Sequence, residues 1–574
     1  MPLDHLFPSF PPERIVYEDD DVIVIDKPVD VSTHAPDAGR TDDAFSRVRL
    51  ALAERDDKAA PSVYLGIHQR LDRDTSGVLL FTKQKKANAG IAAEFEGRHV
   101  KKTYLAVVAH WPKRLEKGVL RDELIPADGG RMQVMPATER APEKRGPSLR
   151  AKGQLAVTRY RVLRRHGTRA LLELCPETGR THQLRVQLAA AGGAIAGDEL
   201  YAGESAVRLM LHASRLELRH PTSGGRLDVR APLPAELEEW LEAPRPVVRA
   251  TDKFFASRLR AAVDARWALG RSHDTTAFRL VHTDGDGIEG IAVDVYGEHF
   301  VLHFFSSDAL ADKEAILDAL EAFGPRGIYL KVHPKQSNTL VDPRTPHLAP
   351  VVPVRGEPAA DPLIVREGGL AFRVRLGDGL KTGIFLDQRE NRRRVRELAH
   401  GKRILNLFAY TCAFTVAAAA GGARSSVNVD ASKGPLEWGE DNLRENGLFS
   451  GAHVMIADDA LIWLKHATKR GERFDLIVLD PPSYATTKTS RFSAASDYAD
   501  LAAKALAVLA PGGSMIACTN HRGISVRKFR KQMHDAGRAV GAVITQLKDL
   551  QCPPDFPAPM GTESHLKSLF VTVK

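Results

Sequence analysis

The sequence predicts a multidomain α/β protein: a β-rich α+β unit, then a small α/β block, then a doubly wound parallel-sheet domain. Its 574 residues are too many for one core, because a domain takes roughly 150 residues. Two proline-rich stretches, 232–246 and 348–362, are typical of segments between domains. From residue 363 onward apolar strands alternate with helical segments, the pattern of an open parallel sheet. We therefore expect domains at residues 1–245, 246–362 and 363–574.

The composition excludes several classes of protein. Apolar residues make up 43% and charged residues 27%, which is ordinary for a globular chain and argues against disorder. No apolar run approaches the roughly 18 residues of a membrane helix, and residues 1–16 do not resemble a secretory signal. The four cysteines lie far apart, without the paired spacing of a zinc ribbon or disulfide framework. We expect a soluble, cytoplasmic protein that binds no metal and no membrane.

The charge distribution points weakly to a polyanionic partner. Lys and Arg number 81 against 72 Asp and Glu, a net charge of +9. The positive residues cluster at 83–86, 98–102 and 392–394. A solvated face is the commoner explanation for any one cluster. Several clusters beside motif-like segments nevertheless favour contact with a phosphate backbone.

Short strands dominate the first unit. Residues 14–27 (RIVYEDDDVIVIDK) alternate into a strand, an acidic turn and a second strand. Further apolar strands are expected at 78–81, 104–108, 155–163 and 170–174. In the middle block, we expect strands within 278–305 and at 327–332, and helices at 252–269 and 309–323.

An aspartate in a glycine-bounded turn, Asp72, precedes the strand at 78–81. Taken alone it could be a turn or cap residue. It belongs, however, to a series of motifs: HQRLDRDTSG at 68–77, KTY at 102–104, GRTHQLRVQ at 179–187 and GDELY at 197–201. Together and in this order they resemble the RluA-type pseudouridine synthases, over most of residues 14–240.

The resemblance implies an α+β pseudouridine synthase fold and a reaction, the isomerisation of uridine to pseudouridine. Isomerising uridine breaks the N-glycosidic bond and rejoins the base through C5, which requires a carboxylate and a proton acceptor. The resemblance implies Asp72 as the catalytic aspartate, Arg185 as its ion-pair partner, and Tyr104 as the ring that stacks on uracil and assists proton removal. Arg70 would hold the deformed RNA strand. No cofactor is implied for this half.

Two positions depart from this family. Gln69 separates His68 from Arg70, where the family usually has histidine directly before arginine. Gln187 stands where the third motif usually ends in histidine. Neither departure falls on an implied catalytic residue, so they bear on substrate identity more than on activity.

In the last domain, carboxylates follow successive predicted strands. Strands at 425–430, 453–456 and 476–480 lead into Asp430, Asp458 and Asp480. Each could be a helix N-cap. Three such acids, the last followed by two prolines and an aromatic residue, are poorly explained by capping. Carboxyl ends of parallel strands meet at one edge of the sheet. There Asp430 could bridge two ribose hydroxyls, and Asp458 could meet an adenine amino group.

Six motifs mark the C-terminal half: KTGIFLDQR at 381–389, NLFAYT at 406–411, GGAR at 421–424, DAS at 430–432, NLRENG at 442–447 and DPPSY at 480–484. In this order they resemble the RlmI/RlmK-type methyltransferases of large-subunit ribosomal RNA, from about residue 278 to the end. Residues 278–354 resemble the small α/β insert that precedes their catalytic domain. The resemblance implies a class I, Rossmann-like catalytic domain, S-adenosylmethionine as cofactor, and structured RNA, the 23S rRNA, as partner.

The resemblance also implies roles for single residues. The implied cofactor-binding residues are Asp387, Phe408, Tyr410, Thr411, Asp430, Asp458 and Asp480. Asp480 is also implied in catalysis, and the implied substrate-binding residues are Pro481, Pro482, Tyr484, Asn520 and Arg522. Cys412 departs from the family, which usually has glycine there, and we expect its side chain to narrow the loop beside the donor.

Two target atoms remain open. Methylating C5 of cytosine requires a thiolate that adds to C6, and Cys518 at a strand end is a candidate. Guanine N7 carries a lone pair, so positioning beside the donor suffices. The segment from Asn520 to Gly523 aligns better with the guanine-N7 branch. A buried, inert Cys518 is therefore favoured.

The sequence thus predicts a bifunctional RNA-modifying enzyme. One alternative is a non-catalytic RNA-binding assembly factor that keeps both folds, against which Asp72, Tyr104, Arg185 and Asp480 argue. The other is a methyltransferase half that acts on a small molecule or protein. The basic segment at 392–396 and the fusion to an RNA enzyme argue against it.

Overall fold

The protein is described by a computed structural model, and the chain divides into two compact units. The residues described are 3–8, 10–34, 43–127, 131–135, 153–206, 208–242, 252–333, 347–486, 491–559 and 562–574. The N-terminal unit is Phe7–Phe254 with Asp264–Ala268, and the C-terminal unit is Leu269–Lys574 with Met1–Leu6 and Phe255–Val263. Most of the predicted linker at 232–246 is described, but its last residues, 243–246, lie outside the described part. The domain borders at 245 and 362 stay predictions.

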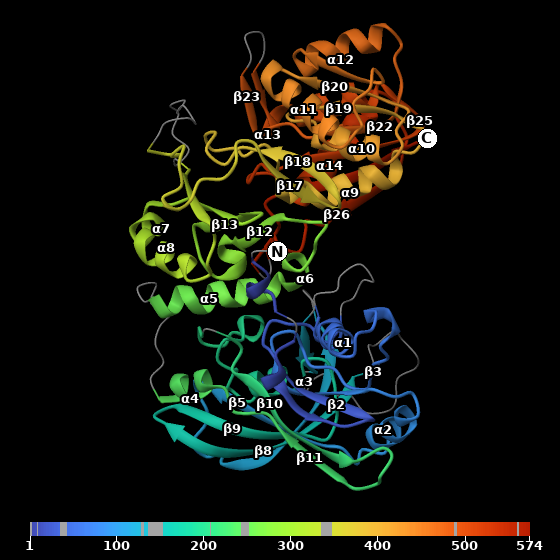
Figure 1. Ribbon diagram of the computed structural model, residues 1–574. Coiled ribbons are helices and arrows are strands. Elements are labelled where there is room, and N and C mark those ends of the chain that lie inside the picture. The colour runs from blue at the N-terminus through green and yellow to red at the C-terminus, as the bar shows by residue number, and fades with distance from the viewer. Residues whose placement is uncertain are drawn as a thin grey trace, which may run out of the picture. The chain divides into compact units, whose positions relative to one another are not determined.

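The N-terminal unit is built on an 11-stranded sheet of described residues (Figure 1). Its main order is β1-β2-β4-β10-β5-β9-β8-β6-β7, with β11 on β10 and β3 on β4. The strands are β1 (Ile15–Glu18), β2 (Val22–Lys27), β3 (Gly66–Ile67), β4 (Ser76–Thr82), β5 (Lys101–Val108), β6 (Lys117–Pro126), β7 (Met132–Val134), β8 (Gln154–His166), β9 (Arg169–Pro176), β10 (Leu211–Arg219) and β11 (Arg226–Arg230). The helices are α1 (Ala44–Arg55), α2 (Ala87–Glu96), α3 (Gln183–Ala190) and α4 (Ala235–Glu242).

Strand alternation explains how this sheet is covered. Ile25 and Phe81 pack in one cluster with residues of α1, whereas Val24 and Leu80 pack in another with a residue of α2. Successive side chains of a strand point to opposite faces, so β2 and β4 are apolar on both. Every strand predicted in this unit is present, whereas β3, β6, β7, β10 and β11 were not predicted.

The middle block forms a five-stranded sheet, β12-β13-β14-β15-β16, followed by the hairpin β17-β18. These strands are β12 (Ala277–His282), β13 (Ile291–Tyr296), β14 (His299–Phe304), β15 (Gly327–Val332), β16 (Arg355–Gly356), β17 (Leu363–Glu367) and β18 (Leu370–Val374). The helices are α5 (Asp252–Ala265), α6 (Trp267–Gly270), α7 (Ser307–Ala311) and α8 (Lys313–Glu321). Each of the two helices predicted at 252–269 and 309–323 is therefore divided into two helices in the structure, so the prediction of continuous helices was wrong. The second is interrupted at Asp312, whose backbone leaves the helical conformation.

The C-terminal segment forms a seven-stranded sheet in the order β21-β20-β19-β22-β25-β27-β26. The strands are β19 (Arg403–Leu407), β20 (Ser425–Asp430), β21 (His453–Ala457), β22 (Phe474–Leu479), β25 (Leu509–Thr519), β26 (Ile544–Leu550) and β27 (Lys567–Val573), beside a hairpin of β23 (Tyr484–Thr486) and β24 (Arg491–Ser493). The helices are α9 (Arg389–Leu398), α10 (Ala413–Ala420), α11 (Lys433–Glu445), α12 (Ala460–Lys469), α13 (Ala494–Leu506) and α14 (Val526–Ala539). The first five strands of the order are parallel, and β27 is antiparallel to its neighbours.

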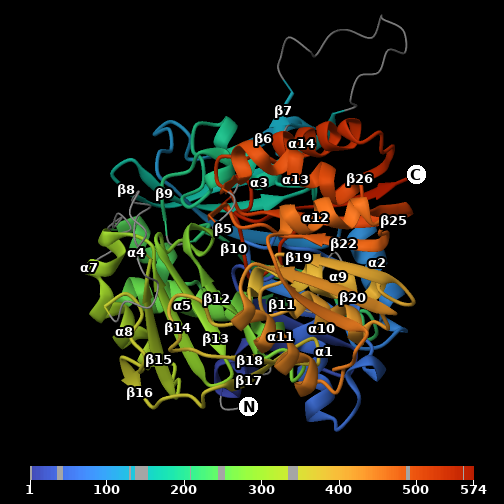
Figure 2. The same cartoon turned by 90° about the horizontal axis from the view of Figure 1, so that it is seen from above.

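Helices cover both faces of this sheet. On β22, Ile477 and Leu479 pack with residues of α12, α13 and α14, whereas Leu476 and Val478 pack with residues of α9 and α10. Figure 2 shows these two groups of helices on opposite sides of the strands. The doubly wound fold is thereby confirmed. Because the strand order reverses at β19, the loops after β19, β20 and β22 converge where such folds bind ligands.

No helix in the described part of the chain is both long enough and apolar enough to cross a membrane.

Candidate active sites

Asp72 lies in the loop between β3 and β4, with a side chain 39% exposed. Two buried residues hold this loop. Thr33 Oγ1 donates to the carbonyl oxygen of Leu71 at 2.9 Å, and Lys27 Nζ donates to that of Arg73 at 3.0 Å. Burial lowers the pKa of Lys27 to about 7. The backbone is thus fixed on both sides of Asp72, while its carboxylate stays accessible.

Arg185, on α3, is held by Asp198 more closely than by Asp72. Its Nε and Nη2 donate to the two Asp198 carboxylate oxygens at 2.8 and 2.7 Å, and both side chains are buried. Its Nη1 lies 3.9 Å from Asp72 and 4.0 Å from Asp74. Burial would lower the pKa of Arg185, but the bonds to Asp198 and the nearby carboxylates raise it. The guanidinium is therefore a fixed positive charge that faces the Asp72 loop.

Tyr104 is a half-buried residue of β5. Burial raises its pKa, and the negative charge of Asp72 raises it further. The phenol is therefore neutral at neutral pH, which suits a stacking surface better than a proton acceptor. Arg70 is exposed on the loop of Asp72, two residues before it. The structure thus brings Asp72, Tyr104 and Arg185 together, with Arg70 at the rim.

The two departures from the family have local partners. Gln187 is buried, accepts from Thr158 Oγ1 at 2.7 Å and donates to Asp122 at 2.8 Å. Gln69 donates to the carbonyl oxygen of Val78 at 3.4 Å. Both side chains therefore serve the packing of the sheet.

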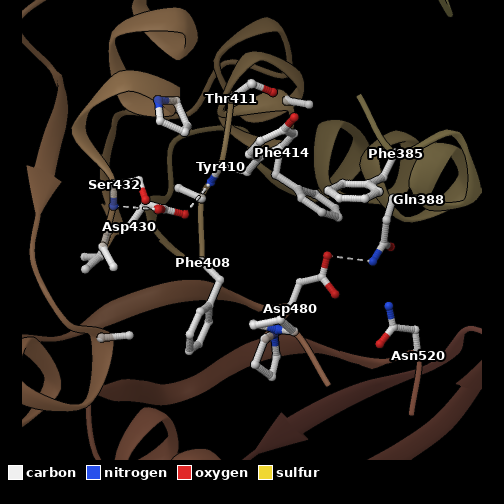
Figure 3. Close-up of a pocket in the computed structure, with 18 of the residues that line it drawn as sticks. Phe385, Gln388, Phe408, Tyr410, Thr411, Phe414, Asp430, Ser432, Asp480 and Asn520 are labelled. Carbon is white, nitrogen blue, oxygen red and sulfur yellow. Dashed lines mark hydrogen bonds between the residues drawn. The ribbon is translucent and has the colours of Figure 1, made fainter. Parts of the chain in front are cut away.

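In the C-terminal unit, a cavity of about 530 Å³ lies at the carboxyl ends of β19, β20 and β22. The loop after β19 has three non-glycine residues with positive φ: Phe408, Tyr410 and Cys412. Asp430 at the end of β20 stabilises this loop, because its carboxylate accepts from the backbone N–H groups of Tyr410 and Ser432, each at 2.9 Å. Figure 3 shows Asp430 beside Tyr410 and Ser432, with Phe408 below them in this view.

Asp480 enters the cavity from the end of β22, toward Gln388 and Asn520 (Figure 3). Gln388 Nε2 donates to its carboxylate at 2.8 Å. Burial, followed by the negative charge of Asp387, raises the pKa of Asp480 to about 7. Burial would also raise the pKa of Asp387, but a 2.9 Å bond to His565 and nearby cations lower it. The pKa of Asp480 is thus raised, whereas that of its neighbour Asp387 is lowered.

The remaining predicted residues are distributed around this cavity. Thr411, Pro481, Pro482 and Asn520 line it, as do Asp387, Phe408, Tyr410, Asp430 and Asp480. Tyr484 is 59% exposed, and its hydroxyl lies 3.0 Å from His521 Nε2. Arg522 lines a second cavity that adjoins the first. Asp458 is not among the lining residues; its neighbour Asp459 lines the cavity and caps α12.

Two expectations from the sequence need correction. Cys412 is not among the residues that line the cavity: its side chain is fully buried against Leu436 and Met455. Arg392 is not a surface cation for RNA, because it is buried in a bidentate ion pair with Glu367 at 2.6 and 2.7 Å. In both cases the sequence showed the residue type but not the direction of its side chain.

Comparison with known proteins identifies both halves. The family model for RNA pseudouridylate synthase matches residues 21–190, and that for S-adenosylmethionine-dependent methyltransferase matches residues 344–571. The "Putative ribosomal RNA large subunit methyltransferase YwbD" of Bacillus subtilis is 35% identical over 306 residues, 53% of this chain and 76% of the relative. The chain is a fusion of an RNA pseudouridylate synthase and an S-adenosylmethionine-dependent methyltransferase.

Two further likenesses concern the methyltransferase half. Ribosomal RNA large subunit methyltransferase I of Aeromonas salmonicida is 32% identical over 305 residues, covering 53% of this chain and 76% of the relative. A solved structure of "a putative methyltransferase complexed with SAH" is similar with a TM-score of 0.52 and 28% identity, covering 62% of this chain and 87% of that chain. The two family models, together with these relatives, show that both halves are enzymes.

S-adenosylmethionine is the cofactor of the methyltransferase half, and when bound it supplies an electrophilic methyl group. The cavity fits such a positively charged nucleoside. It is lined by the carboxylates Asp387, Asp430 and Asp480 and by the aromatic ring of Phe408, and about 530 Å³ accommodates a nucleoside with a side chain. Within the described ranges, no three His, Cys, Asp or Glu side chains are grouped to hold a metal ion.

Proposed function

We propose that this enzyme isomerises uridine to pseudouridine and methylates guanine at N7, with both reactions in the 23S RNA of the large ribosomal subunit. The RNA assignment is supported by the named activity of the relatives of the methyltransferase half. A cytoplasmic location, where ribosomal RNA is made, belongs to this proposal. The domain borders at residues 245 and 362 are also part of this proposal.

In the synthase half, Asp72 is the catalytic carboxylate. It attacks the nucleoside, or assists glycosidic cleavage, so that the base can turn and rejoin through C5. The guanidinium of Arg185, fixed by Asp198, lies 3.9 Å from the Asp72 carboxylate and presents a positive charge to it. The neutral ring of Tyr104 supports the uracil by stacking, and Arg70 contacts the RNA at the rim.

In the methyltransferase half, the lining of the donor cavity is the observation that supports guanine N7 as the methylated atom. Among the described residues no cysteine lines this cavity. Cys518 is fully buried, and burial together with the charge of Asp480 raises its thiol pKa well above the ordinary value. Cysteine thiolate is the nucleophile that cytosine C5 chemistry requires, whereas guanine N7 reacts through its own lone pair.

The acceptor base would be positioned by the turn after β22. Ser483 Oγ donates to Asn520 Oδ1 at 2.7 Å, which joins the Asp480–Tyr484 turn to the loop after β25. Pro481 and Pro482 line the cavity beside Asp480, and the exposed ring of Tyr484 lies next to this turn. These groups would hold a flat base in line with the methyl group.

Tritiated-methyl transfer to ribosomal RNA, followed by nucleoside analysis, tests this proposal. We expect label in 7-methylguanosine, most of it retained by Cys518→Ser, since that side chain does not reach the cavity. Asp480→Ala should lose most of the label. Label in 5-methylcytidine that disappears with Cys518→Ser would overturn guanine N7 in favour of cytosine C5.

A further inference from the structure

A second cavity, of about 520 Å³, lies beside the donor cavity. Strands of the five-stranded middle sheet and the catalytic segment both line it. The two cavities share lining residues, among them Phe385, Asp387, Tyr410 and Asn520. Figure 3 places Phe385 and Asn520 on the side of the donor cavity where Asp480 lies. A group in the second cavity would therefore lie next to the base that receives the methyl group.

Among the aromatic rings that line this second cavity, His303, Phe305 and His333 lie nearly parallel to one another. The centroids of Phe305 and His333 are 4.5 Å apart with an interplanar angle of 21°. Those of His303 and His333 are 5.3 Å apart at 29°. Such nearly parallel rings form a stack with a flat outer face, and stacking on aromatic side chains accepts any nucleobase.

A chain of hydrogen bonds fixes this ring platform of His303, Phe305 and His333. The buried carboxylate of Asp294 lies 3.0 Å from His303 Nε2, and His303 Nδ1 lies 3.0 Å from His333 Nε2. Nε2–H of each histidine can therefore donate along the chain to Asp294. Burial lowers the pKa of both histidines, that of His333 to about 3. The rings are thus uncharged at neutral pH and present apolar faces.

Positive side chains border the same cavity. Arg279, Lys381 and Arg522 line it together with the carboxylates of Asp284, Glu289, Asp294 and Asp387. Arg279 is paired with Asp294, whereas Arg522 is exposed. The guanidinium of Arg279 stacks on the ring of Phe556, 4.7 Å from its centroid. Aromatic platforms next to arginine and lysine side chains are the means by which proteins bind unstacked bases and their phosphates in single-stranded RNA.

We propose that the second cavity binds the base of a nucleotide adjacent to the methylated one in the same single-stranded RNA segment, stacked on the outer face of the ring platform of His303, Phe305 and His333. This inference rests on the methylation of RNA in the proposed function. It does not depend on which base atom is methylated. The platform would select an acceptor whose neighbour is unstacked, such as a loop nucleotide.

Photocrosslinking tests this directly. The full-length protein is irradiated with a short single-stranded RNA of mixed sequence that carries 5-iodouridine, and crosslinked peptides are mapped by mass spectrometry. We expect an adduct on Phe305 or His333 that an excess of unsubstituted RNA suppresses. Phe305→Ala should lower the adduct yield and raise the KM for RNA in methyl transfer by about five-fold or more, with little change in kcat. Phe305→Tyr should restore both.

Controls separate this inference from the proposed function. Phe449→Ala removes a ring that is 48% exposed and lines neither cavity, so it should change neither adduct nor KM. Calorimetric binding of S-adenosylmethionine shows that each variant keeps its donor site. Absence of an adduct on Phe305 or His333, with an unchanged KM for Phe305→Ala, would overturn the inference. An adduct on Phe305 or His333 together with methyl label in a base other than guanine would leave this inference intact. It would refute only the assignment of guanine N7 as the methylated atom.

Discussion

Arg185 forms a buried bidentate ion pair with Asp198, at 2.7 and 2.8 Å, and turns only Nη1 toward Asp72, 3.9 Å away. The arginine therefore has a structural anchor that is distinct from the catalytic carboxylate. Because the anchor uses Nε and Nη2, the guanidinium plane is fixed before any RNA binds. Asp72 thus meets a preorganised positive charge.

Asp198→Ala should therefore damage both folding and pseudouridine formation. Removing one partner of a buried pair leaves an uncompensated charge, so the free energy of unfolding of the N-terminal unit should fall by about 3 kcal/mol or more. Pseudouridine formation should fall by about two orders of magnitude, because Arg185 loses its orientation. Denaturant titration and a tritium-release assay measure the two effects.

The matched control for that substitution is Asp228→Ala. Asp228 pairs with Arg215 at 2.6 and 2.7 Å, but both side chains are more than a quarter exposed. Its loss should cost less than about 1 kcal/mol and leave pseudouridine formation unchanged. Equal effects of the two substitutions would refute the anchoring role of Asp198.

Methyl transfer should depend on the ionisation of Asp480. Its pKa is raised to about 7, so the carboxyl holds its proton below that pH and is negative above it. The negative form attracts the positively charged donor, so kcat/KM should rise from pH 6 to pH 8 with a midpoint near 7. Asp387→Asn removes a neighbouring negative charge and should move the midpoint to lower pH.

The control for this pH profile is Asp549→Asn, which changes an exposed carboxylate that lines neither cavity. Its profile should match that of the unaltered enzyme. A midpoint that stays fixed or rises in Asp387→Asn would contradict the assigned coupling between Asp387 and Asp480.

Cys412→Gly should leave donor affinity within about three-fold, since this side chain packs against α11 and not into the cavity. Its φ of 57° favours glycine, while loss of the buried side chain leaves a small void. These effects oppose each other, so the free energy of unfolding should change by less than about 1 kcal/mol. Calorimetry of S-adenosylmethionine binding measures the affinity. A ten-fold gain would mean that Cys412 obstructs the donor after all.

The parallel sheet and its strand-end carboxylates could be predicted from the sequence, because buried strands consist of apolar runs that are followed by polar residues. Asp430 and Asp480 were located in this way. The anchor at Asp198 could not be derived, since it depends on how α3 packs against a turn 13 residues later. Asp459 lines the cavity where the sequence had predicted Asp458. Both residues lie between the end of β21 and the start of α12, so no strand alternation indicates which of them faces the cavity.

The second cavity, with its platform of His303, Phe305 and His333, was also absent from the sequence interpretation. Its rings lie on or after two strands that are parallel neighbours, β14 and β15, and no local pattern shows that they stack. Periodicity identifies elements and their buried faces. Which faces of different elements meet is decided by tertiary packing.

The measurement that tests the central claim most directly is mass-spectrometric nucleoside analysis of unmodified large-subunit ribosomal RNA after incubation with the full-length enzyme and S-adenosylmethionine. We expect both pseudouridine and 7-methylguanosine. Asp72→Asn should abolish pseudouridine and leave 7-methylguanosine largely intact, because the two reactions use separate sites. Pseudouridine at the unaltered level in Asp72→Asn, or 5-methylcytidine in place of 7-methylguanosine, would contradict the account.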